Sequence, residues 1–185
     1  MKKILIGLGA VLAVIIIIFI SSYNSIVAKH ETITAKWAQV DNQLQRRNDL
    51  IPNLINTVKG YAAHEKEVFI AVTNARSQWA NAGSLEEKVK AASVVDTTLS
   101  RLLLVAENYP ELKANESFLR LMDELSGSEN RIVVERMRYN DAVRDYNVTV
   151  RMFPGNIIAG ISGYKVVSEY FQAEGKAKIV PEVKF

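Results

Sequence analysis

The two histidines are the residues whose surroundings come closest to a catalytic motif, because a glutamate follows each of them directly. His64 begins the zinc-binding pattern H-E-x-x-H, but Val68 stands where the second histidine belongs, and His30 fails in the same way at Thr34. Structural and catalytic zinc sites need three or four converging protein ligands. Two histidines outside such a motif more often pack or face solvent, so we predict no metal site and no cofactor.

The sequence also contains no complete motif for nucleophilic catalysis. Ser162 and Lys165 match the pattern S-x-x-K, but none of the motifs that accompany it in known hydrolases is present, and Tyr164 replaces the last glycine of G-x-S-x-G. The carboxylate pair Glu86-Glu87 falls on a face that we expect to be solvated, whereas acid–base catalysis needs a shielded pocket. The chain has no cysteine, which excludes thiolate chemistry and disulfides. We therefore predict no catalytic residues and no enzymatic activity.

Charge excludes a further class of function. The 23 Lys and Arg and the 20 Asp and Glu are interleaved along the chain and give a net charge of +3. Nucleic-acid binding usually needs a concentrated basic face, so we predict no nucleic-acid partner. Interleaved charges of both signs are typical of solvated helix faces.

An unbroken apolar run, residues 4–20, follows Lys2 and Lys3 at the N-terminus. As a helix its 17 residues span about 26 Å, the short end of the range that crosses a bilayer. A cleaved signal peptide is the alternative, but the run is long for one and no A-x-A-like site follows. We predict that residues 1–22 are a transmembrane anchor in the cell (inner) membrane, crossed once. Lysines on the N-terminal flank favour a helical domain on the non-cytoplasmic side.

After the anchor, apolar residues recur every seventh position, the period of packed helices. Tyr23, His30 and Trp37 begin one such stripe. We expect this first helix to end near residues 46–48, a second helix over residues 50–79 with Asp49 as its N-cap, a third from residue 85 to the Asn108-Tyr109-Pro110 stop, and a fourth over residues 116–153. The fourth carries the most regular repeat: Phe118, Leu125, Ile132, Tyr139, Tyr146 and Phe153.

Helices joined by short turns pack antiparallel. The predicted fold class is therefore all-α, with an N-terminal transmembrane helix followed by an elongated, coiled-coil-like, antiparallel up-and-down four-helix bundle over residues 23–164. Residues 165–185 would form a C-terminal tail that could be extended.

The up-and-down order returns the apolar, glycine-rich segment after the fourth helix to the bilayer. A membrane-proximal contact through this segment, or a cap over the end of the bundle core, would both use its apolar character. The residues that we expect to make this contact are Pro154, Ile157, Ile158, Ile161 and Tyr164.

Two segments resemble the LemA family of bacterial membrane-anchored proteins: residues 42–65, which include QRRNDLIPNL and VKGYAAHE, and residues 138–164, with paired Tyr-Asn dipeptides leading into Phe-Pro. The resemblance covers nearly the whole chain. It implies a membrane protein with a helical domain, and it does not imply an enzyme. It also implies a link to envelope stress or membrane-protein quality control beside a membrane protease, and it leaves open a cytoplasmic helical domain.

Several polar residues fall on or beside the inward stripes. A polar group removed from water is costly unless it is paired, so we predict a hydrogen-bonded cluster in which Asp49 pairs with Arg46 or Arg47. Such a cluster would either fix the helix register or form a docking site. The predicted members are Arg46, Arg47, Asp49, Asn53, Asn140 and Asn147.

Two functions remain. The first is a non-enzymatic membrane-anchored scaffold or interaction protein, with a protein partner such as a membrane protease. The second is a lipid-contacting, membrane-remodelling protein that self-assembles. Long helices with heptad stripes also favour a homo-oligomer.

Overall fold

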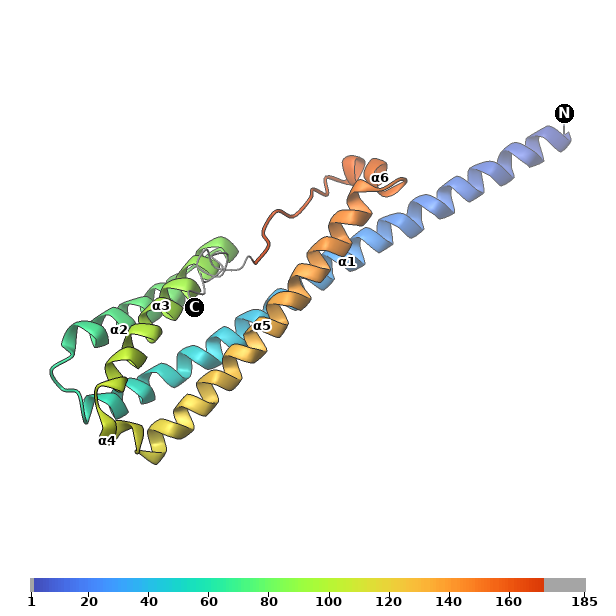
Figure 1. The fold of residues 1–185 in the computed structure, drawn as a ribbon. Coiled ribbons are helices and arrows are strands. Elements are labelled where there is room, and N and C mark those ends of the chain that lie inside the picture. Colours follow the sequence, from blue (N-terminus) through green and yellow to red (C-terminus); the bar gives the residue numbers. More distant parts are fainter. Residues whose placement is uncertain (1, 172–185) are drawn as a thin grey trace, which may run out of the picture. The chain divides into compact units, whose positions relative to one another are not determined.

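The computed structural model describes residues 2–171, and helices dominate that part of the chain (Figure 1). The helices are α1 (Lys2–Lys59), α2 (Lys66–Asn81), α3 (Leu85–Glu107), α4 (Pro110–Lys113), α5 (Glu116–Arg151) and α6 (Gly155–Ser162). No strand occurs among residues 2–171. The all-α prediction with a long apolar N-terminal helix is confirmed. The predicted boundaries at residues 22 and 164 stay a prediction, and residues 172–185 of the expected tail lie outside the described part.

The chain divides into two compact units. The terminal unit combines the chain up to Ala38 with the chain from Arg136 onward, and the middle unit is Gln39–Glu135. Helices α1 and α5 each contribute residues to both units.

The predicted boundary between the first two helices is wrong. Helix α1 does not end near residue 48, and Asp49 is not an N-cap, because the helix runs through Pro52 to Lys59. The break comes at residues 60–65, and α2 starts at Lys66. A proline inside a helix costs about 3 kcal/mol through its missing N–H and its steric clash.

Burial explains why α1 continues past the proline. The inward stripe keeps its spacing of three and four residues across Pro52, and Ile51, Leu54, Ile55 and Val58 are all buried. Each buried side chain of this size contributes about 1.5–3 kcal/mol. Four of them outweigh the cost of the proline, and breaking the helix at residue 49 would break this stripe.

The middle unit is built on these stripes. Helices α2 and α3 pack against each other, and Ser84 and Glu87 form the capping box at the start of α3, as their spacing predicts. The N–H groups of Gly83 and Ser84 donate to the Glu87 carboxylate, at 2.9 and 3.2 Å, and lower its pKa. The buried core of this unit includes Val40, Leu44, Ile51, Val58, Val72, Trp79, Val95, Leu99, Leu102, Phe118, Leu125 and Ile132.

The terminal unit continues the heptad stripe with aromatic contacts. Tyr23, His30 and Trp37 lie along α1, and their rings contact Tyr164, Tyr146 and Tyr139, in that order, at centroid distances of 6.4, 5.5 and 6.0 Å. The seven-residue spacing on α1 is therefore matched by Tyr139 and Tyr146 on α5.

The sixth position of the α5 repeat differs from the prediction. Phe153 lies beyond the end of α5 and is 79% exposed. The chain then turns sharply into α6 at Gly155, where a Cβ would stand 2.1 Å from the carbonyl oxygen of Thr149. Only glycine allows this close approach.

Candidate functional site

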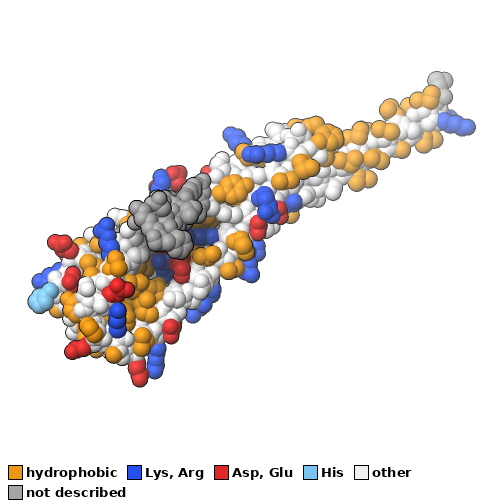
Figure 2. All heavy atoms as spheres, viewed as in Figure 1, with side chains coloured by type: hydrophobic (Ala, Val, Ile, Leu, Met, Phe, Trp, Pro, Cys, Tyr) orange, Lys and Arg blue, Asp and Glu red, His pale blue; other side chains and the backbone are white. Residues whose placement is uncertain are grey.

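The apolar arm of α1, residues 2–21, is exposed along its whole length. Figure 2 shows it covered with hydrophobic side chains, with lysine at its end. Among residues 2–171, α1 is the one helix long and apolar enough to cross a membrane, with a mean hydropathy of 3.1 in its best window. By length and composition, this arm is a candidate membrane span, consistent with a membrane-anchored protein.

The predicted membrane-proximal residues divide between surface and core. Ile157 and Ile161 are exposed, at 53% and 71%, whereas Ile158 is buried at 3%. The α6 helix therefore presents one apolar face outward and packs the other. Tyr164, just after α6, contacts Tyr23 of α1. Because Tyr23 follows the apolar run 4–20 by three residues, the end of α6 lies close to the end of that run.

Arg47 is the centre of a buried ion cluster in the middle unit. Its side chain is 8% exposed, and Nη1 lies 2.5 Å from Asp96 of α3 and 2.8 Å from Glu129 of α5. These two carboxylates are the partners of Arg47, and the predicted partner, Asp49, is not one of them. Asp49 accepts a hydrogen bond from Gln45 instead, because it faces solvent on α1 together with Arg46 and Asn53.

The two predicted asparagines on α5 belong to the terminal unit and bind main chain rather than Arg47. Their partner is an unwound segment, Lys165–Phe171, which we call the strap (Figure 1). Asn147 Nδ2 donates to Val167 O at 2.7 Å, and Val167 N donates to Asn147 Oδ1 at 2.8 Å. Asn140 makes the same pair with Phe171, at 2.9 Å in both directions.

An aromatic cage holds the last described residue of the strap. The Phe171 ring stacks on Trp37 at 5.8 Å and meets Tyr139 edge-on at 5.4 Å. The guanidinium of Arg136 lies 5.1 Å from the same ring, a cation–π distance. We call Trp37, Arg136, Tyr139, Asn140, Tyr146 and Asn147 the strap site.

The two tyrosines of the strap site differ in their hydroxyl groups. Tyr146 Oη donates to the Lys165 carbonyl at 2.9 Å, whereas Tyr139 Oη is buried with no hydrogen-bond partner among the described residues. Burial, then the negative charge of Glu169, raises the pKa of Tyr139 to about 12. Burial also raises the pKa of Tyr146. Both phenols are therefore neutral at physiological pH.

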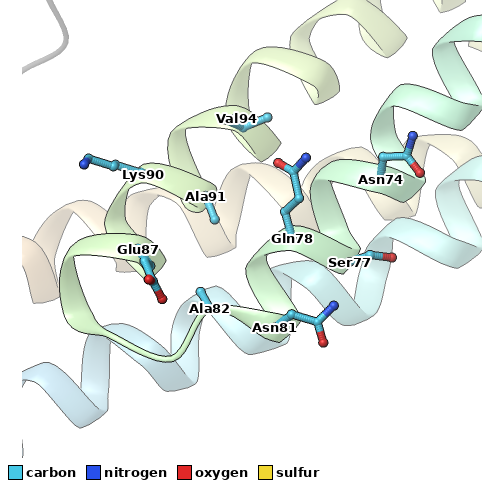
Figure 3. A pocket seen from close by; sticks show the side chains of 9 residues that line it. All are labelled: Asn74, Ser77, Gln78, Asn81, Ala82, Glu87, Lys90, Ala91 and Val94. Atoms are coloured by element: carbon cyan, nitrogen blue, oxygen red, sulfur yellow. The ribbon is translucent and has the colours of Figure 1, made fainter.

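An open hollow of about 710 Å³ lies between α2 and α3 (Figure 3). Its polar lining residues, such as Gln78 and Lys90, are exposed, and Lys90 is already paired with Glu86 at 2.7 Å. A ligand site normally combines apolar enclosure with a few fixed polar groups. The polar side chains of this hollow are solvated, and the Glu87 carboxylate in its lining is already used by the capping box of α3.

Sequence reasoning singled out Asn140 and Asn147 but missed what they bind. Asp96 and Glu129 were also missed, because both lie on stretches that read as solvated faces. The histidines have other roles: His30 contacts Tyr146 and Tyr164, and no group of three or more His, Cys, Asp or Glu among residues 2–171 could hold a metal.

Comparison with known proteins gives the chain a family. A model described as the LemA family matches residues 36–185. Magnetosome protein MamQ 2 of Paramagnetospirillum magneticum is 28% identical over 176 residues, covering 81% of this chain and 64% of that protein. Protein LemA of Metamycoplasma hominis is 23% identical over 143 residues, covering 77% and 65%. The chain thus spans somewhat under two thirds of the length of these relatives. Because the family model matches most of the chain, the protein belongs to the LemA family.

Proposed function

We propose that the protein is a membrane-anchored, non-enzymatic scaffold that presents helical surfaces to another protein. The observation that carries this proposal is the exposed apolar arm of α1, which continues without a break into a helix whose inner face is buried from Ile26 onward. A bilayer is the environment in which about 20 consecutive apolar residues are stable. Relatives named MamQ and LemA support membrane association, and neither name denotes a reaction.

Two lysines placed in the arm test the anchor. A lysine at the centre of a transmembrane helix costs about 2.5–3.5 kcal/mol on insertion scales, so Val11→Lys with Ile15→Lys should move the protein out of the carbonate-resistant membrane fraction. Val133→Lys, at an exposed apolar position on α5, is the matched control and should stay in that fraction. An arm variant that remains as resistant as the control would refute the anchor.

We further propose a single pass through the inner membrane with the helical domain on the non-cytoplasmic side. The lysines that flank the arm support this orientation. Because the chain has no cysteine, Ile70→Cys provides a unique label on exposed α2. A membrane-impermeant maleimide should label it on spheroplasts without lysis. Labelling that requires lysis would place the domain in the cytoplasm.

The partner that we propose is a membrane protein of the quality-control machinery, such as a membrane protease, bound by this protein as a homo-oligomer. Capture of the tagged full chain from detergent-solubilised membranes should recover such a protease in fixed stoichiometry. Recovery of the chain alone would remove the protease from the proposal.

Contact with lipid through α6 is a second candidate function. Exposed Ile157 and Ile161, together with the contact between Tyr164 and Tyr23, support it. An environment-sensitive dye on Ile161→Cys should be quenched by spin-labelled lipid in liposomes, whereas the same dye on Ile70→Cys should not. Ile158 is unsuited to this test because it is buried. Equal quenching at both positions would exclude a specific contact.

A further inference from the structure

The strap is bound to its own protein in the way that a peptide is bound to a receptor. It has no regular secondary structure. Six hydrogen bonds join it to α5, five through main-chain atoms of the strap and one through the Tyr170 hydroxyl. Most of its side chains, including Val166 and Tyr170, are substantially exposed. Little of the strap is therefore buried as a core element would be.

The two asparagines bind features that every peptide has. Each donates to a carbonyl and accepts from the N–H of the same strap residue, so neither bond pair depends on the strap side chain. Two positions seven residues apart are separated by about 10.5 Å along a helix. Four residues of extended chain cover about 13 Å, so a peptide that crosses α5 obliquely meets both amides.

The aromatic cage supplies the selectivity. Three side chains, Trp37, Arg136 and Tyr139, surround the ring of Phe171. They attract an aromatic ring through apolar contact and through the electrostatics of stacking and cation–π interactions. The ligand class is therefore an extended peptide with an aromatic residue four positions after the residue held by Asn147.

We infer that the strap site is a binding site for an extended peptide, occupied in cis by Lys165–Phe171, which also accepts the strap of a second copy of this chain. The segment seen in the site is the best-supported ligand, and a second copy carries it by definition. Exchange of identical elements between copies needs no new contacts. This inference rests on the proposed role as an interaction protein and names one partner.

A synthetic peptide with residues 164–171, YKVVSEYF, tests the site. In the full chain in detergent micelles, the cis strap competes at an effective concentration of order millimolar. Phe171→Ala removes the ring that the cage holds, so this variant should bind the fluorescent peptide at least tenfold more tightly than wild type. A peptide with alanine in place of its phenylalanine is the control and should bind neither protein.

Adding Asn140→Asp and Asn147→Asp to Phe171→Ala removes the amide donors with little change in side-chain size. Peptide binding should then weaken at least tenfold, while helicity by circular dichroism stays unchanged. Equal binding by wild type and Phe171→Ala, or binding that survives loss of both asparagines, would overturn the peptide site.

A complementation experiment tests the second copy. One tagged chain carries Phe171→Ala, with an open site and a weakened strap, and the other carries Asn140→Asp with Asn147→Asp, with an intact strap and a weakened site. The two should capture each other in detergent more than either captures itself. Capture of equal strength in all combinations would contradict strap exchange. Carbonate resistance of the same chains is read separately, so failure here is distinct from failure of the membrane anchor.

Discussion

Arg47 in the middle unit and Asn147 in the terminal unit are buried to the same extent, at 7% and 6% exposure, yet their polar groups are satisfied in different ways. Arg47 is paired with carboxylates on two other helices, α3 and α5. Asn147 is paired with the main chain of an unwound segment. The first arrangement depends on particular side chains in particular helices. The second depends mainly on main-chain groups, with one further bond from Asn147 Nδ2 to the Tyr170 hydroxyl.

The Arg47 ion cluster therefore fixes the fold, whereas the bonds of the asparagines can be made to another peptide segment. A buried charge without its counter-charge is costly, so the Arg47 cluster penalises any other alignment of the helices that supply its carboxylates. An asparagine amide can bond to any extended chain. We therefore expect changes at Arg47 to affect the stability of the whole molecule and changes at the asparagines to affect the strap alone.

The largest effect should come from Arg47→Met. Removing one partner from a buried ion cluster costs about 3–5 kcal/mol when the other charges stay buried. Since the Asp96 and Glu129 side chains are 20% and 43% exposed, we expect a loss toward the lower end, about 3 kcal/mol. Urea unfolding of the full chain in micelles, followed by circular dichroism, measures it.

Arg46→Met is the matched control on the neighbouring, exposed position of α1. It should change the free energy of unfolding by less than about 0.5 kcal/mol. Equal losses for the two arginines would mean that the ion cluster does not hold the helices in register.

A slightly smaller loss is expected at the turn that leads into α6 and the strap. In Gly155→Ala the new Cβ would meet the backbone oxygen of Thr149 at 2.1 Å, and overpacking of this kind costs about 1–3 kcal/mol. Gly160→Ala, with nothing within 4 Å of its Cβ, should be neutral or stabilising by about 0.5–1 kcal/mol. Thermal unfolding of the two variants checks the difference in sign.

The helical part of the fold could be predicted because its stripes repeat every seven residues, which fixes element type and inward face. The end of α1 could not, because local signals at Asp49 and Pro52 compete with burial of Ile51 and Val58 across the proline. Propensity is a weak prior, and tertiary packing overrides it.

The site was predictable to a different degree. Arg47 and Asn147 could be recognised as polar residues on inward stripes, but their partners are far away in the sequence. The partners of Arg47 are at least 49 residues away, and Val167 is 20 residues from Asn147. A single sequence carries no signal for which charged residue of a solvated-looking face turns inward. Main-chain partners such as Val167 are invisible to side-chain pattern altogether, since any residue type would serve.

Local effects should follow at the asparagines. Asn147→Ala removes the acceptor of the Val167 N–H, and Asn140→Ala removes that of Phe171. Each lost bond is worth about 0.5–1.5 kcal/mol, so hydrogen exchange at the corresponding amide should accelerate roughly tenfold, with little change at the other. Exchange followed by mass spectrometry resolves the strap. Faster exchange throughout the middle unit in either variant would contradict a role confined to the strap.

The smallest effects should distinguish the two buried tyrosines. Tyr146→Phe removes the bond to the Lys165 carbonyl and should cost about 1 kcal/mol. Tyr139→Phe removes a hydroxyl that has no partner among the described residues, so it should be neutral or slightly stabilising at pH 7. Thermal unfolding of the two variants, which differ from wild type by one oxygen each, makes the comparison direct.

Raising the pH above about 10 should lower the stability of the folded protein, mainly through the ionisation of Tyr139. Its pKa is about 12 in the folded protein against 10.0 for the free side chain, so between these values the unfolded chain loses a proton that the folded chain keeps. Stability should therefore fall as pH rises from about 10 toward 12, because the unfolded state binds fewer protons there. Tyr139→Phe should fall less steeply than wild type over this range. A phenolate absorbance titration that shows Tyr139 ionising with the exposed tyrosines near pH 10 would contradict the buried, unpartnered hydroxyl on which the prediction depends.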